Sequence, residues 1–186
     1  MNRSPVIKIQ TPLNDSDLID LRIGDKILLS GIIYTGRDAA HKRMYDLLVE
    51  GKPLPFDISG QVIYYVGPSP AKPGQIIGSA GPTTSGRMDA YAPLLIASGL
   101  KGMIGKGLRD HTVIDAMKQY KSIYMGATGG AAALISKKIK RCEVVAYDDL
   151  GTEAIHKLEI EDMPLIVIND IYGGDLYVEG INKYQR

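Results

Sequence analysis

The stretch GPTTSGR, from Gly81 to Arg87, combines residue types that can bind and process an anion. Gly81 and Pro82 are typical of a turn, and the three hydroxyl residues that follow are of the kind that cap helix N-termini. Apolar residues then recur at three- and four-residue spacing, which predicts a helix: Met88, Tyr91, Leu94, Leu95 and Ala97. Arg87 would stand at the start of that helix, where the helix dipole is already positive. A bound anion would remove the conflict, because backbone N–H groups, the dipole and a guanidinium would converge on it.

Two further cations occupy similar places in the sequence. TGRDAAHKR (35–43) follows an expected strand and opens an expected helix, so Arg37 stands at a second helix start. In GMIGKGLRD (102–110), Lys106 lies between two glycines just before another helix, and such glycines allow close approach to the backbone. A simpler explanation exists for each: Asp38 offsets Arg37 at a solvated helix start, and Lys106 is a surface lysine in a tight turn.

Arg37, Arg87 and Lys106 share one setting, the turn from a strand into a helix. Turns of that kind gather at one edge of an α/β sheet. Three cations there would suit a small polyanion, either a phosphate ester or a dicarboxylate held by arginine forks. Each charge-assisted hydrogen bond contributes about 1.5–3 kcal/mol. The residues therefore predict a small anionic ligand without naming it.

Other familiar site motifs are missing from the sequence. GMIGKG is not a P-loop, because Leu100 and Gly107 stand where that motif needs Gly and Ser or Thr. GATGGAAAL (126–134) lacks the G-x-G-x-x-G spacing of a dinucleotide site. Its glycines could form an anion nest, although we favour close packing of the alanine-rich helix on the sheet. The chain also has no G-x-S-x-G nucleophile elbow, which argues against an ordinary α/β-hydrolase.

Short strands that alternate with helices must position these loops. Alternation and apolar runs predict strands at 6–10, 26–34, 61–66, 75–79, 142–149, an exposed one at 156–162 and a buried one at 164–170. Helical spacing predicts helices at 36–50, after Gly86, at 110–119 and at 131–138. Glycine at strand ends before helices is typical of α/β layering, and β-rich ends favour a mixed central sheet flanked by helices. Without a linker or repeat, residues 1–186 are expected to form a single domain.

Composition narrows the class of protein. With 22 basic and 21 acidic residues the net charge is +1, so a general nucleic-acid binder is not expected. The start MNRSPVIKIQ lacks the apolar region of a signal peptide, and no run reaches the ~18 apolar residues that span a membrane. A soluble cytoplasmic protein is expected. The three histidines are too scattered for a zinc motif, and the single Cys142 can form neither an internal disulfide nor a cluster site, so no metal ligands are expected.

The motifs as a set identify a family. LSGIIYTGRDAAHKR, IIGSAGPTTSGRMDAYAPLLI, GMIGKG, GATGGAAAL and LGTEAIHKLEIEDMPLIVIND resemble, in order, the C-terminal domain of class I iron–sulfur fumarate hydratase. In some organisms that domain is a separate β subunit. The resemblance covers about residues 28–170, with GPTTSGRMD and TGRDAAHKR the most specific parts. It implies a swivelling β/β/α domain.

The resemblance also implies a reaction and a partner. It implies that an α subunit carries a [4Fe–4S] cluster on three cysteines, with one open iron that acts as a Lewis acid. The reaction would be the reversible hydration of fumarate to (S)-malate. On matching positions, Arg37, Arg87 and Lys106 resemble the residues that bind substrate carboxylates, and Thr83 resembles the residue that takes the C3 proton. Cys142 would then be structural, and Asp89 would orient Arg87 or cap the helix rather than catalyse.

Alternatives remain at this stage. The related β subunit of L-tartrate dehydratase and the mesaconate-type hydratases share this architecture and would change only the substrate. A protein of another class, a non-catalytic module that binds a small anion, could also use this fold. By the resemblance we expect a small dicarboxylate substrate and an α2β2 heterotetramer, with no nucleic acid or membrane as partner.

Overall fold

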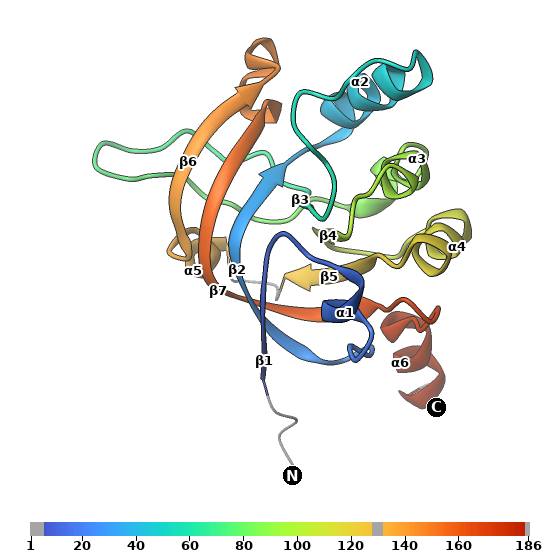
Figure 1. Ribbon diagram of the computed structural model, residues 1–186. Coiled ribbons are helices and arrows are strands. Elements are labelled where there is room, and N and C mark those ends of the chain that lie inside the picture. The colour runs from blue at the N-terminus through green and yellow to red at the C-terminus, as the bar shows by residue number, and fades with distance from the viewer. Residues whose placement is uncertain (1–5, 128–131, 185–186) are drawn as a thin grey trace.

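The computed structural model describes residues 6–127 and 132–184 and shows a mixed α/β fold around a seven-stranded sheet (Figure 1). The strands are β1 (Ile7–Gln10), β2 (Lys26–Thr35), β3 (Val62–Tyr64), β4 (Gly102–Gly105), β5 (Ile123–Ala127), β6 (Ile139–Ala146) and β7 (Ile155–Asn169). The helices are α1 (Asp15–Leu18), α2 (Asp38–Val49), α3 (Ala92–Ala97), α4 (His111–Tyr120), α5 (Ala132–Ser136) and α6 (Leu176–Tyr184), with 3-10 turns η1 (Ser85–Met88) and η2 (Asp148–Glu153). The predicted mixed sheet flanked by helices is confirmed.

The sheet closes on itself. Its order is β1-β2-β3-β4-β5-β7-β6, and β7 also pairs with β2, so the strands from β2 round to β7 form a barrel-like ring. The pairs from β1 through β5 are parallel, whereas β7 runs antiparallel to β2, β5 and β6. The carboxyl ends of β2, β3, β4 and β5 therefore meet at one edge, as the sequence predicted for its strand-to-helix turns.

Helices cover one side of this ring. In Figure 1, α2, α3, α4 and α6 lie in a row beside the strands, and α2, α3 and α4 each follow a parallel strand and lead to the next. Successive side chains along β3 and the residue after it point to opposite faces of the sheet, so they enter two different cores. Val62 and Tyr64 join a core made chiefly by the strands around the ring, while Ile63 and Tyr65 join a second core shared with the helices.

The expected strand at 75–79 is wrong. These residues belong to a long loop, residues 67–80, which extends past β6 in Figure 1 and makes no strand pairing. Pro68, Pro70 and Pro73 lack backbone donors, which opposes a sheet ladder. Two hydrogen bonds between Ser69 and Ser79 close the loop instead. The Ser69 N–H donates to the Ser79 carbonyl at 3.1 Å, and the Ser79 N–H donates to the Ser69 hydroxyl at 2.8 Å.

Two other expectations need correction. The helix predicted after Gly86 is divided into η1 and α3, because Pro93 has no N–H to give and is accommodated only in the first turn of α3. The two strands predicted at 156–162 and 164–170 are one strand, β7. Its first half is not exposed as expected, since Leu158 and Ile160 are buried between β2 and β6.

The helices of this fold are short, and α2, with 12 residues, is the longest in the part of the chain described. None of those within residues 6–127 and 132–184 is both long enough and apolar enough to span a bilayer.

Candidate functional site

Three loops meet at the carboxyl ends of β2, β3 and β4, and two of them are joined by backbone hydrogen bonds. The N–H of Thr83 donates to the carbonyl of Tyr65 just beyond β3, at 2.7 Å. The Lys106 N–H donates to the Thr83 carbonyl at 3.3 Å, and the Ser85 N–H donates to the Lys106 carbonyl at 2.9 Å. Thr83 is half-buried and Lys106 is exposed. The structure therefore brings Thr83 and Lys106 together, although they lie on separate loops.

Arg37 and Arg87 complete this edge. Arg37 is the N-cap residue of α2, directly after β2, and its Nη1 lies 3.0 Å from Glu153 Oε1. Arg87 lies in η1, and its Nη1 is 3.6 Å from Asp38 Oδ2 in the first turn of α2. Asp38 thus offsets Arg87 rather than Arg37. All four sequence-predicted site residues belong to neighbouring loops at one edge.

The Arg37 side chain packs against the backbone of Gly67. A Cβ atom at Gly67 would lie 3.1 Å from both Cδ and Nη1 of Arg37 and 3.2 Å from the Thr152 carbonyl. The guanidinium therefore lies against bare backbone at the end of β3. This contact joins the loops that follow β2 and β3.

The start of α2 holds polar atoms that lack partners. Within residues 6–127 and 132–184, Arg37 Nε, Asp38 Oδ1 and His41 Nε2 are buried without a hydrogen-bond partner, and no side chain caps this helix. Buried polar atoms normally have partners, so three of them together are typical of a place where a ligand binds. The uncapped N-terminus of a twelve-residue helix beside a guanidinium suits an anion.

His41 is a neutral group at this position. Its Nδ1 lies 3.0 Å from the Arg37 carbonyl and must donate, since a carbonyl only accepts, which leaves Nε2 as a free acceptor. Its ring packs edge-on against Tyr65, with centroids 5.1 Å apart. Complete burial is the main cause that lowers the pKa of His41 to about 4. The imidazole therefore adds no charge at neutral pH.

Sequence reasoning missed the buried ion pair beneath these loops. Arg109 Nε lies 2.7 Å from Asp89 Oδ1, and the side chains are 0% and 12% exposed. Asp89 therefore binds Arg109 and not Arg87, which corrects the first of its two expected roles. Its Oδ2 also accepts the N–H of Asp110 at 2.7 Å, just before α4 begins. No periodicity could reveal this pair, because Asp89 and Arg109 meet only when the loops pack.

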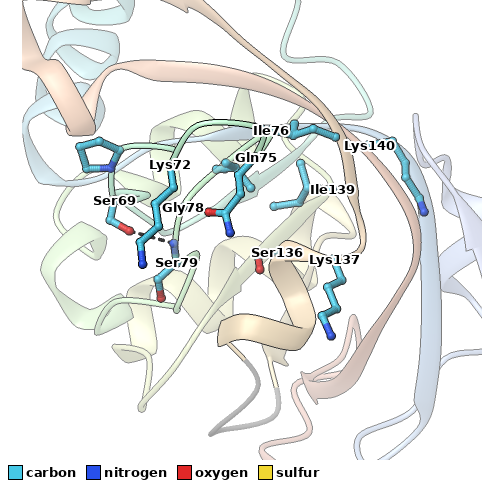
Figure 2. Close-up of a pocket in the computed structure, with 13 residues that line it drawn as sticks. Ser69, Lys72, Gln75, Ile76, Gly78, Ser79, Ser136, Lys137, Ile139 and Lys140 are labelled. Atoms are coloured by element: carbon cyan, nitrogen blue, oxygen red, sulfur yellow. Dashed lines mark hydrogen bonds between the residues drawn. The ribbon is translucent and has the colours of Figure 1, made fainter.

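A sizeable cavity lies away from these residues. It measures about 670 Å³ and is bounded by the 67–80 loop on one side and by α5 and the start of β6 on the other (Figure 2). Lys72, Lys137 and Lys140 line it, and none of the four predicted site residues does. The strand-end loops are a candidate site because of their polar groups and not because of a cavity volume.

Metal ligands are not grouped in the part of the chain described. No three His, Cys, Asp or Glu side chains there are arranged to hold an ion. Cys142 lies on β6, half-buried against the strand core, and burial raises the pKa of its thiol. A [4Fe–4S] cluster needs several thiolates, so the described residues of this chain do not fit one. The glycine-rich residues 128–130, favoured for packing, lie outside the described residues; at Gly126 a Cβ would lie 3.1 Å from Ile168.

Comparison with known proteins assigns the family. The family model described as Fumarase C-terminus matches residues 2–180. The chain is 39% identical over 181 residues to the anaerobic class I fumarate hydratase of Escherichia coli strain K12, covering 95% of this chain and 33% of that protein. It is 36% identical to fumarate hydratase 2 of Leishmania major, covering 94% and 30%. It is also 36% identical to a protein of Methanocaldococcus jannaschii named for the beta subunit of L(+)-tartrate dehydratase, covering 92% and 90%.

These matches differ in how much of each relative they span. The chain covers about a third of the length of the fumarate hydratases and nearly all of the tartrate dehydratase subunit. The matched region includes every loop at the carboxyl ends of β2, β3 and β4. The chain belongs to the Fumarase C-terminus family.

Proposed function

We propose that this chain is the β subunit of a two-subunit hydro-lyase of the class I fumarate hydratase type, which reversibly hydrates fumarate to (S)-malate. One observation carries the proposal: Arg37, Arg87, Lys106 and Thr83 lie on adjoining strand-end loops in a chain of this family. A dicarboxylate needs two cationic subsites and a group that faces the carbon between them. In this proposal the two arginines supply the subsites and Thr83 supplies the facing group.

The charges at the site support carboxylate binding. Arg87 is 56% exposed and only loosely paired with Asp38, and Lys106 makes no ion pair within residues 6–127 and 132–184. Arg37 forms an ion pair with Glu153 through Nη1, and its Nε has no hydrogen-bond partner among the described residues. In this proposal the two guanidiniums bind carboxylates as forks, and the Lys106 ammonium adds a point charge.

Thr83 is proposed to take the C3 proton. A threonine hydroxyl is a weak base near neutral pH, because its pKa lies far above it. Nearby positive charge favours the deprotonated form of such a group. Lys106 is a neighbour of Thr83, since its backbone N–H donates a hydrogen bond to the Thr83 carbonyl. We further propose that an acidic or histidine partner from the second subunit assists it.

The remaining assignments rest on the resemblance. The iron–sulfur cluster is proposed to belong to an α subunit, in a cytoplasmic α2β2 assembly. The relative named as a tartrate dehydratase beta subunit is matched over 90% of its length, which supports a separate subunit. The same match favours L-tartrate as the second candidate substrate; a mesaconate-type substrate or a non-catalytic anion-binding module would be further alternatives.

Anaerobic assays test the proposal. Fumarate hydration and L-tartrate dehydration are measured with this chain alone and with its cluster-bearing partner. Fumarate turnover by the pair only is expected, and tartrate turnover would change the substrate. In the active pair, Arg87→Lys should lose about 10- to 100-fold in turnover with the fold intact, because a point charge cannot replace a fork worth ~1.5–3 kcal/mol. A stable complex with an intact cluster that turns over neither compound, yet binds an anion, would favour the module.

A further inference from the structure

We infer that Arg109 is a positioning residue for the proposed dicarboxylate site: with Asp89 it forms a buried support that fixes the Thr83–Arg87 segment against Lys106. This inference rests on the proposed function, since it concerns how the same site is assembled. Arg109 is not one of the groups proposed to touch the ligand. Its charge is instead neutralised by Asp89 within the fold.

The Arg109 guanidinium is surrounded by a carboxylate and two tyrosine side chains. Its Nε donates to Asp89 Oδ1 at 2.7 Å, and its Nη2 lies 3.4 Å from the Tyr65 hydroxyl. The guanidinium carbon lies 4.9 Å from the Tyr124 ring centroid and 5.3 Å from that of Tyr65, within the range of cation–π attraction. A charge with no exposure is tolerated only when it is paired in this way.

Asp89 transmits this anchoring to two loops. It follows η1 directly and lies two residues after Arg87, so its position sets that of the arginine backbone. One carboxylate oxygen accepts from Arg109 and the other from the N–H of Asp110, which begins the turn into α4. The carboxylate therefore holds the η1 segment to the loop that carries Lys106.

A second contact joins the same loops. Burial raises the pKa of Tyr124, so its hydroxyl stays protonated and donates to the Gly107 carbonyl at 3.1 Å. The Ser85 hydroxyl then donates to Tyr124 at 2.8 Å. Gly105 leaves the space for this contact, because a Cβ there would lie 2.0 Å from Ser85 Oγ. The Tyr124 hydroxyl thus fixes both Ser85 and Gly107, which lie close in sequence to Thr83 and Lys106.

The test separates positioning from general stability. Arg109→Lys keeps the charge and loses the separate Nε and Nη2 donors. Leu18→Ala removes a fully buried side chain from α1 as a stability control. Amide exchange is followed at Ser85 and Lys106, relative to amides of β2, in the full chain. The kcat/KM and kcat of the assembled enzyme are measured for each variant below its unfolding range.

The expected results are specific to the site. In Arg109→Lys, exchange at Ser85 and Lys106 should rise at least tenfold and kcat/KM should fall at least tenfold, whereas Leu18→Ala changes kcat/KM less than twofold. If Arg109→Lys does not fold, Tyr124→Phe should raise the same two exchange rates in a milder form. Tyr147→Phe is its control, because the buried Tyr147 hydroxyl has no hydrogen-bond partner in the part of the chain that the structure describes.

Three outcomes would decide against parts of this account. Unchanged exchange in the folded Arg109 and Tyr124 variants would overturn the inference. Raised exchange with kcat/KM equal to that of the Leu18 control would also overturn it, because Arg109 would then be structural only. A wild-type enzyme that turns over no dicarboxylate would overturn the proposed function, while the exchange data would still decide whether Arg109 holds the segment.

Discussion

Arg87 and Arg109 follow glycine-rich turns at the same edge of the sheet, yet their surroundings differ completely. The Arg87 side chain is 56% exposed and 3.6 Å from its nearest carboxylate, whereas the Arg109 side chain has no exposure and contacts Asp89 at 2.7 Å. Arg109 also lies between two tyrosine rings. A guanidinium that is already neutralised inside the fold has no free capacity for a ligand. Of these two arginines, we therefore propose that only the exposed and loosely paired Arg87 binds a substrate carboxylate.

The same distinction orders the other cations. Arg37 is intermediate, with one ion pair to Glu153 and one buried N–H left unpartnered. Lys106 is exposed. We therefore propose that cations sharing a sequence setting divide into ligand-binding and supporting groups according to their burial and pairing. Substitutions at these groups and their neighbours test that division.

The largest effect is expected at Arg109. Arg109→Met should lower the free energy of unfolding by about 3–5 kcal/mol, because the buried Asp89 carboxylate loses its charge partner. Arg87→Met, at the exposed position, should change it by less than about 0.5 kcal/mol. Urea unfolding of both variants measures the difference. Similar losses in the two variants would refute the contrast between them.

His41 is a buried group that stays neutral, and it should make stability depend on pH. Its folded pKa of about 4 lies below the ordinary value of 6.5, so the unfolded chain binds more protons between these pH values. Stability should therefore rise from pH 4 to pH 6.5, by up to ~3 kcal/mol from this residue. Unfolding free energies from pH 4.5 to 7 should show that slope reduced in His41→Leu. Parallel curves for the two proteins would contradict the assignment.

Gly105 tests the packing beneath the site. Gly105→Ala should lose about 1–3 kcal/mol of stability, because its Cβ would lie 2.0 Å from Ser85 Oγ. Ser85→Ala in the same chain should recover part of that loss. Gly180→Ala in α6 is the control, because open space surrounds that position and alanine favours a helix by about 0.5–1 kcal/mol. Thermal unfolding compares the three, and a loss that Ser85→Ala does not relieve would argue against the contact.

The smallest effect is expected at the partly exposed pair of Arg37 and Glu153. Glu153→Gln should cost only about 0.2–1 kcal/mol of stability, because solvent screens such a pair. The cost should shrink further in high salt. Chemical unfolding at low and high salt measures both. A loss above about 2 kcal/mol would place Arg37 with the supporting cations rather than the ligand-binding ones.

Much of the fold could be predicted from the sequence. Periodicity predicted α2 and α4 to within about two residues at each end, since both have regular apolar faces. Periodicity failed where proline interrupts an apolar pattern. This happens in the loop 67–80 and at Pro93, which divides the helix after Gly86. The single-domain organisation of residues 1–186 stays a prediction.

For the site, the sequence by itself determined the residue types at the strand-end turns and, through GPTTSGR and TGRDAAHKR, the family. Only the tertiary structure decided which charges are free. Asp38 meets Arg87, Glu153 meets Arg37, and Asp89 meets Arg109 across separate loops. The physical reason is that the energy of a charge depends on its burial and on its distance to other charges. Both are set by packing between segments far apart in the chain.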